Sequence, residues 1–176
     1  MGRSRDLSEG SYVATDFALA SSNLPAGTVL QTVYHEFEDA TTTTTSQSYV
    51  DVTNGSSSIT SIGTNSKFLV TVSASVYQAS GNGINLGINR TLGGTTTRLL
   101  GVEGNKDAWL GHGNGPGATT NQSGSITRFC LDDPSQSSGT TITYKMLLGK
   151  WTSGTAYLNY TNYECKSFII IQEIAA

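Results

Sequence analysis

The sequence is poor in charged residues and in residues that crosslink or kink a chain. Only 13% of its 176 residues are Asp, Glu, Lys or Arg, and it has three Pro and two Cys. An average protein has ~25% charged residues, and a coiled coil has more, so this composition excludes a coiled coil. The 10 basic and 13 acidic residues give a net charge of −3 without a basic stripe. Nucleic acid is therefore not the expected partner.

Long apolar runs are also missing. The longest is Phe168–Ile171, far short of the ~20 residues of a membrane-spanning helix. The first residues contain no hydrophobic leader, so we expect no membrane insertion and an origin in the cytoplasm. Cys130 and Cys165 are too few for a zinc site. We favour two buried thiols for them, with a single disulfide as the alternative.

Gly, Ser and Thr are abundant, with 20, 22 and 25 copies, and apolar residues recur with a period of two. Phe68, Val70, Val72, Ala74 and Val76 share one face of an extended segment, which is typical of a half-buried strand. Turn-forming clusters such as Gly81–Gly83 and Asp132–Pro134 bound these segments. Further strands are expected over Val29–Phe37, Ser48–Thr53, Ser57–Ile62, Ile84–Ile88, Thr96–Val102, Ser125–Phe129, Thr141–Met146, Ala156–Tyr160 and Ser167–Glu173.

Eight to ten short strands without helices between them predict an antiparallel, all-β sandwich or barrel. We expect the loop Gly104–Gly124 to lack regular structure. Residues 1–28 show no such period and end on turn residues, so we interpret them as an extended arm with one short helical turn near Asp16–Ser21. Residues 29–176 would then form the β head.

The last strand breaks the alternation. Phe168, Ile169, Ile170 and Ile171 place large apolar groups on both faces, and the chain has no helix to cover the second face. Burial against a neighbouring copy would stabilise each such side chain by ~1.5–3 kcal/mol. We therefore predict an interface between copies here. The alternative is that the strand lies centrally in the sandwich under a long loop.

No catalytic motif is present, and no cofactor or metal ion is expected. Glu36 and Glu38 project to one side of a strand, as a glycosidase's two carboxylates could. Nothing in the sequence supplies a second wall for such a site, so solvation at a strand end or a weak calcium contact is the better interpretation. His35 has the strand parity of Phe37 and is expected to pack or to lie in an interface.

Three residues in the glycine-rich loop are candidates for receptor contact. Trp109, His112 and Asn114 offer an aromatic ring, an imidazole and an amide, which together could bind a sugar. A plain surface loop is the alternative.

A longer stretch of sequence resembles a β domain found in tail fibres and other surface proteins of bacteriophages, particularly aquatic phages and cyanophages among them. The resemblance begins at Gly27–Gln31 and spans about residues 27–176. Its order of motifs carries the likeness: Thr43–Thr53, Ser58–Thr60, Asn65–Val70, Phe129–Pro134, Thr143–Lys145, Gly154–Asn159 and Ser167–Ile174.

This resemblance implies a jelly-roll-like sandwich that assembles as a homotrimer on the surface of the virion. It also implies a role without catalysis, as a short fibre or knob for host attachment that contacts a host-surface glycan. Capsid decoration is the alternative, and a carbohydrate-binding module a lower one. The arm would then hold the head to other virion proteins, with its charged and apolar side chains as the anchoring candidates: Arg3, Arg5, Leu7, Tyr12 and Phe17.

Overall fold

The computed structural model describes residues 24–38, 41–79, 83–101, 109–110, 122–150, 154–160 and 166–176. These residues form strands and connections and no helix, so none of them forms a helix that could cross a membrane. The strands are β1 (Val29–Phe37), β2 (Thr42–Thr44), β3 (Val50–Thr60), β4 (Lys67–Ala79), β5 (Ile84–Leu92), β6 (Thr95–Leu100), β7 (Trp109–Leu110), β8 (Gln122–Asp132), β9 (Thr141–Lys150), β10 (Thr155–Leu158) and β11 (Ser167–Ile174).

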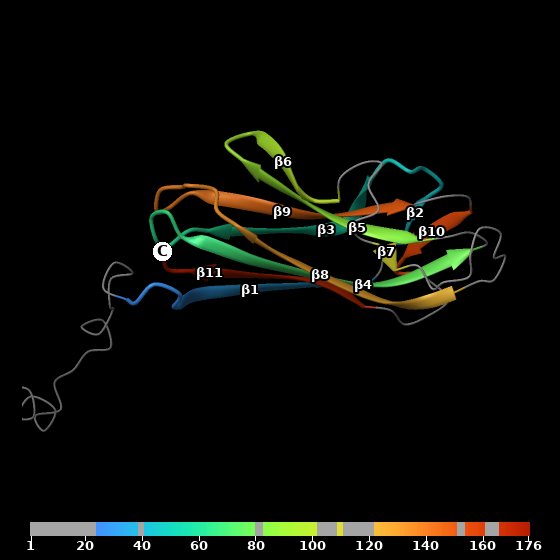
Figure 1. The fold of residues 1–176 in the computed structure, drawn as a ribbon, viewed down its shortest axis with the longest axis horizontal. Helices are drawn as coiled ribbons and strands as arrows, with labels where there is room; N and C mark the ends of the chain where they lie inside the picture. The colour runs from blue at the N-terminus through green and yellow to red at the C-terminus, as the bar shows by residue number, and fades with distance from the viewer. Residues whose placement is uncertain are drawn as a thin grey trace, which may run out of the picture.

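Two antiparallel sheets lie face to face (Figure 1). The first has the order β1-β11-β4-β10-β2, with β8 also paired to β4. Because β11 pairs with the first half of β4 and β10 with its second half, this sheet is four strands wide along the whole of β4. The second sheet has the order β3-β9-β5-β6, with β7 paired to β5.

The eight main strands pair in a nested order. The first pairs with the last (β1 with β11), and the pairs β3 with β9, β4 with β8 and β5 with β6 follow inward. Such a nested series is one long hairpin folded over onto itself, which is the jelly-roll arrangement. The predicted all-β, jelly-roll-like sandwich is confirmed.

The structure corrects several predicted boundaries. The segments Ser48–Thr53 and Ser57–Ile62 form parts of one strand, β3, whose register with β9 shifts between Asp51 and Ser56. Asn54 has a φ of 59° there, so a bulge bends the strand without ending it. The Gly104–Gly124 segment is not free of regular structure, because β7 lies within it and β8 begins at Gln122.

The core fills the space between the sheets with the inward side chains of both. It consists of aliphatic and aromatic residues at alternate strand positions, as the period of two predicts. Fully buried examples are Phe68, Val70, Leu86, Ile142, Tyr144, Met146, Ile169 and Ile171.

A buried carboxylate closes one end of the sandwich. Glu173 on β11 is fully buried and accepts hydrogen bonds from the backbone amides of Ile62 (2.9 Å) and Gly63 (2.8 Å) and from Gln31 Nε2 (2.6 Å). Burial alone would raise the pKa of Glu173, but these donors favour the ionised form, and the net effect lowers the pKa below its ordinary value. Glu173 therefore ties the β3–β4 connection to the last strand.

The Tyr49 ring packs against three glycines at the second sheet. The Tyr49 ring is so close to Gly87, Gly101 and Gly149 that a Cβ atom on Gly149 would lie 3.0 Å from the ring, and one on Gly101 would lie 2.6 Å from it. Above the ring, the Arg98 guanidinium carbon is 4.8 Å from its centroid, a cation–π arrangement. Only glycine leaves room for this packing.

Candidate functional site

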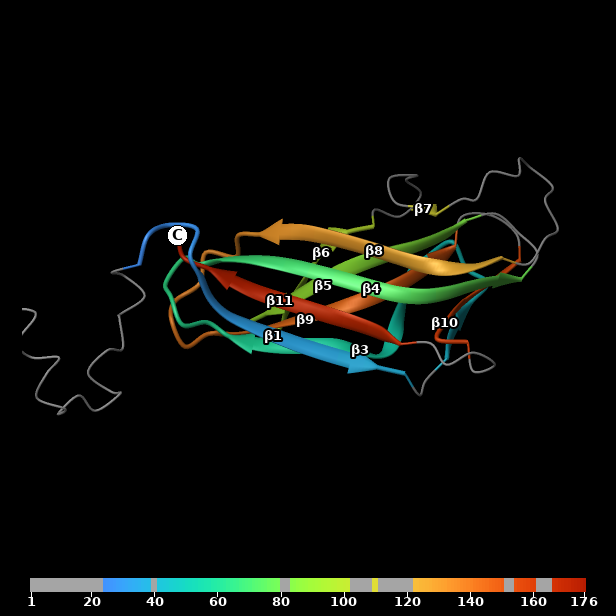
Figure 2. The same ribbon diagram turned by 90° about the horizontal axis from the view of Figure 1, so that it is seen from below.

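The outward face of the first sheet is the most unusual surface of the described residues. Figure 2 looks onto this face, on which β8, β4, β11 and β1 lie side by side. Cross-strand partners share a face of a sheet, so the strand registers identify which side chains point outward.

Three adjacent rows of outward positions cross all four strands. Six of these twelve side chains are large and apolar or aromatic, five are polar without charge, and one is charged. The rows, from β1 to β8, are Thr32, Gln172, Leu69 and Leu131, then Tyr34, Ile170, Thr71 and Phe129, then Glu36, Phe168, Ser73 and Thr127. We call the six large ones, Tyr34, Leu69, Phe129, Leu131, Phe168 and Ile170, the outer patch.

Several members of the outer patch are well exposed in the single chain. Phe129 is 69% exposed, Leu131 59% and Tyr34 56%. Phe168 and Ile170 are half-buried, and the Phe168 ring lies 5.8 Å from that of Tyr34. Soluble monomers rarely expose a contiguous apolar surface of this kind, so such a surface usually marks an interaction site.

The charged side chains around the outer patch form ion pairs within the chain. Glu36 accepts hydrogen bonds from Lys166 Nζ (2.6 Å) and from Tyr34 Oη (2.6 Å). At the opposite end of the face, Lys67 Nζ lies 4.0 Å from an Asp133 carboxylate oxygen. The surface between these two ion pairs is therefore uncharged.

The outward face of the second sheet has a different character. It carries an exposed ion pair between Lys145 and Asp51 (2.8 Å) and hydroxyl pairs that cross neighbouring strands, such as Ser58 with Thr143 (2.8 Å). Such a face is compatible with water, as one face of an antiparallel sheet usually is. The outward face of the first sheet also has a hydroxyl pair, Ser73 with Thr127 (2.9 Å), and an exposed ion pair, Lys166 with Glu36, so its distinguishing feature is the outer patch.

The structure corrects the predicted interface on the last strand. Phe168 and Ile170 point outward into the outer patch, but Ile169 and Ile171 are fully buried in the core of the same chain. Successive residues of a strand face opposite sides, so a strand that is apolar on both faces can bury one of them in the core of its own chain. Phe168 and Ile170 remain candidates for an interface between copies, whereas Ile169 and Ile171 do not.

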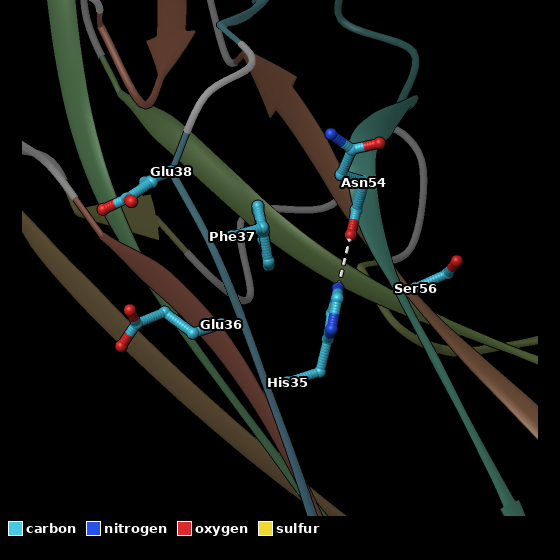
Figure 3. Close-up of a pocket in the computed structure, with 6 residues that line it drawn as sticks. All are labelled: His35, Glu36, Phe37, Glu38, Asn54 and Ser56. Atoms are coloured by element: carbon cyan, nitrogen blue, oxygen red, sulfur yellow. Dashed lines mark hydrogen bonds between the residues drawn. The ribbon is translucent and has the colours of Figure 1, made fainter.

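An open pocket of about 470 Å³ lies between the end of β1 and the middle of β3, where β3 has its bulge (Figure 3). Its lining residues are His35, Glu36, Phe37, Glu38, Asn54 and Ser56. His35 Nε2 is 2.9 Å from the Asn54 carbonyl oxygen, and since a carbonyl can only accept, this nitrogen carries the proton. The imidazole also stacks on Phe37 at 5.8 Å, so His35 packs as expected.

The two carboxylates of this pocket are arranged for an ion pair with a lysine. Lys166 Nζ lies 2.6 Å from Glu36 and 3.3 Å from Glu38. The hydrogen bond from Lys166, and then that from Tyr34, lower the pKa of Glu36 below its ordinary value. A glycosidase needs one carboxyl group with a raised pKa as its general acid, and Glu36 has the opposite shift.

Several sequence candidates lie outside what the structure describes. These are the arm residues Arg3, Arg5, Leu7, Tyr12 and Phe17, the loop residues His112 and Asn114, the side chain of Trp109, the helical turn near 16–21, and Cys165. Cys130 is a half-buried free thiol packed against the core. Within the described ranges, no three His, Cys, Asp or Glu side chains gather closely enough to hold a metal ion.

Sequence reasoning missed Phe129 and Leu131 as members of the surface. The signal was present, because the two residues share the parity of Ser125 and Thr127 and not that of Ile126. The residues at the alternate positions, on the side of Ile126, include Arg128 and Asp132. Charged residues are not expected to face a core, so these two obscured the pattern. Asp132 is buried because Arg90 (2.7 Å) and Tyr144 Oη (2.8 Å) donate hydrogen bonds to it.

Comparison with known proteins finds similar structures only at low identity. No protein-family model matches the chain, and no curated protein matches it in sequence. Membership of the bacteriophage tail-fibre family therefore stays a prediction.

Solved structures with a similar arrangement include viral proteins. A subviral particle of infectious bursal disease virus VP2 is 13% identical over 84% of this chain and 39% of that one, with a TM-score of 0.35. A pentameric capsid protein from metagenomic phage sequences is 17% identical over 85% and 62%, with a TM-score of 0.28. The Eiger TNF of S. frugiperda is 13% identical over 82% and 93%, with a TM-score of 0.46.

Proposed function

We propose that this chain is a structural component of a virus particle, without catalytic activity, whose β head assembles as a homotrimer through the outer patch. The outer patch on the outward face of the first sheet carries the proposal. The number of copies, the location on the virion surface and the role in host attachment follow from the resemblance to bacteriophage fibre heads. In this function the N-terminal segment, through residues such as Arg3, Arg5 and Leu7, holds the head to other virion proteins.

The outer patch can supply a substantial part of an interface between copies. Its three rows span ~20 Å along the strands at ~3.3 Å per residue, and four strands spaced ~4.8 Å apart make it ~19 Å wide, which gives roughly 400 Å². One side of a standard protein interface buries ~800 Å², so the surface that flanks the outer patch supplies the rest. Burial of a large apolar side chain contributes ~1.5–3 kcal/mol, and the outer patch offers six of them.

Sedimentation of the purified chain tests the assembly. We expect wild type to sediment as three copies of the 18.5 kDa chain. Phe129→Asp and Leu131→Asp should give folded monomers, because both side chains are exposed in the single chain and a charge in an apolar interface is costly. Thr95→Asp, an exposed position on the second sheet, is the matched control and should stay trimeric. A monomeric wild type would refute the proposed assembly.

Virus particles test the biological role. Particles purified from the virus that encodes the chain should contain it, and particles without it should lose adsorption to the host while keeping their resistance to heat. If they keep adsorption and lose heat resistance, the chain is a decoration protein of the shell. Absence of the chain from purified particles would refute a structural role in the virion.

A further inference from the structure

Three tyrosines gather at one end of the outward face of the first sheet, apart from the outer patch. Tyr77 on β4 pairs across the strands with Tyr157 on β10, and Tyr160 is the second residue after the end of β10. The Tyr77 and Tyr160 rings stack at 4.8 Å with an angle of 16°. The Tyr157 ring meets Tyr160 edge-on at 4.9 Å. The cluster thus fixes the Tyr160 ring from two sides.

Beside this cluster lies a hollow of about 240 Å³. Small residues form its floor because Ser123 of β8 is opposite Tyr77, and Ser125 is opposite Ser75 of β4. The lining residues are Ser75, Val76, Tyr77, Ser123, Gly124, Ser125 and Tyr160. The Tyr160 ring therefore stands next to a recess lined by three serines. The Ser75 hydroxyl donates to the Lys166 carbonyl oxygen (3.5 Å) and can still accept a hydrogen bond from a ligand.

This combination matches the chemistry of a sugar ring. A pyranose presents C–H groups on one face, which pack on an aromatic ring, and hydroxyl groups at its edge, which exchange hydrogen bonds with serine hydroxyls. None of the described residues that line the hollow is charged, and a sugar is an uncharged ligand that such a lining suits. The outer patch has large protruding side chains, whereas this end of the face has a hollow. A hollow can take up a small ligand, but it leaves a gap against the sheet of a second copy.

The hollow is also far from the end of the sandwich at which Gly27 and Ala175 lie. Gly27 and Ala175 are hydrogen-bonded (2.9 Å) at the end of the sandwich where β4 starts, and the C-terminus lies there in Figure 1. Tyr77 is ten residues further along β4 than Lys67, a distance of ~33 Å. A head held to a particle at the first end would present the hollow toward the other.

We propose that the hollow beside Tyr160 binds a pyranose unit of a glycan, with the ring stacked on Tyr160 and its hydroxyls bonded to Ser75, Ser123 and Ser125. As the site of host contact, it rests on the function proposed above. The serine and tyrosine residues that form it differ from the loop residues Trp109, His112 and Asn114 that the sequence offered as candidates.

Saturation-transfer NMR with the full chain tests this site. The probes are the methyl glycosides of glucose, galactose, mannose and N-acetylglucosamine, together with an array of bacterial surface polysaccharides. Wild type should transfer saturation to the C–H protons of at least one sugar. Tyr160→Ala should weaken that binding at least tenfold, whereas Tyr160→Phe, which keeps the ring, and Thr95→Ala on the second sheet should retain it.

A second variant guards against misfolding of Tyr160→Ala. Ser125 is exposed, so Ser125→Trp should fold, fill the hollow and abolish binding. Binding of no probe by wild type, or equal binding by wild type and Ser125→Trp, would overturn the proposed site. If the chain is a trimer that binds no sugar, the sugar site is refuted and the proposed assembly is not. If the chain is a monomer that binds sugar through Tyr160, the proposed assembly is refuted and the site is not.

Discussion

Replacement of Glu173 by Gln tests whether the buried carboxylate ties the sandwich together. Three donors converge on it: two backbone amides and the Gln31 amide. A hydrogen bond to a charged group contributes ~1.5–3 kcal/mol. Glutamine keeps the shape and one acceptor oxygen, but it turns an NH₂ group toward the remaining donors. We therefore expect the free energy of unfolding to fall by about 3 kcal/mol, or the Tm by about 6–12 °C for a chain of this size.

Urea unfolding followed by circular dichroism, at one protein concentration for all variants, measures this change. The dependence on urea should keep its slope, because the surface exposed on unfolding is unchanged. Glu36→Gln is the matched control: Glu36 is an exposed glutamate paired with Lys166, and because exposed ion pairs contribute little, its loss should cost far less than that of Glu173. Stability of Glu173→Gln within ~0.5 kcal/mol of wild type would show that the carboxylate does not hold the β3–β4 connection.

The same carboxylate predicts a pH dependence. The pKa of Glu173 is lower in the folded chain than its ordinary value, so its stabilising contribution is complete above the unfolded value of ~4.3. The contribution is lost as the pH falls from there through the folded pKa. The gap in stability between wild type and Glu173→Gln should therefore narrow below about pH 4. A constant gap down to pH 2 would contradict this assignment.

Two further outcomes are expected. Gly149→Ala should destabilise the fold by ~1–3 kcal/mol, because the added Cβ would lie 3.0 Å from the Tyr49 ring. In a Tyr49→Ala background the same change should cost little, and an equal cost in both backgrounds in urea titrations would contradict the contact. Burial, and then the Asp132 carboxylate, raise the pKa of Cys130 to about 11. In a Cys165→Ser chain at pH 8, Cys130 should react with a maleimide roughly 200-fold more slowly than a free thiol, and a rate equal to that of free cysteine would be inconsistent with the structure.

The sequence predicted the architecture well because most strands follow the simplest rule. On β4, inward Phe68, Val70 and Val72 alternate with outward residues that are mostly polar apart from Leu69, and a period of two can be recognised without knowledge of the neighbours. The apolar character of both faces of β11 was likewise visible in Phe168–Ile171. The sequence did not show which of these side chains face the chain's own core, because that depends on the position of β11 between β1 and β4.

The candidate sites were harder to predict because they combine strands that are far apart in the sequence. The outer patch joins Tyr34, Phe129 and Phe168 through cross-strand registers. The Asp132–Pro134 segment shows a turn signal, yet Asp132 ends β8 as a buried acceptor of Arg90. Its partner lies 42 positions away, and local propensity contains no information on such a contact.

The hydrogen bond between Gly27 and Ala175 has a practical consequence for handling the protein. Because Gly27 and Ala175 lie at the same end of the sandwich, a fluorescent label or surface tether placed after Ala176 would lie at that end too. The tyrosine-lined hollow would stay clear of the support, so an immobilised head could be screened for ligands with the hollow facing the solution.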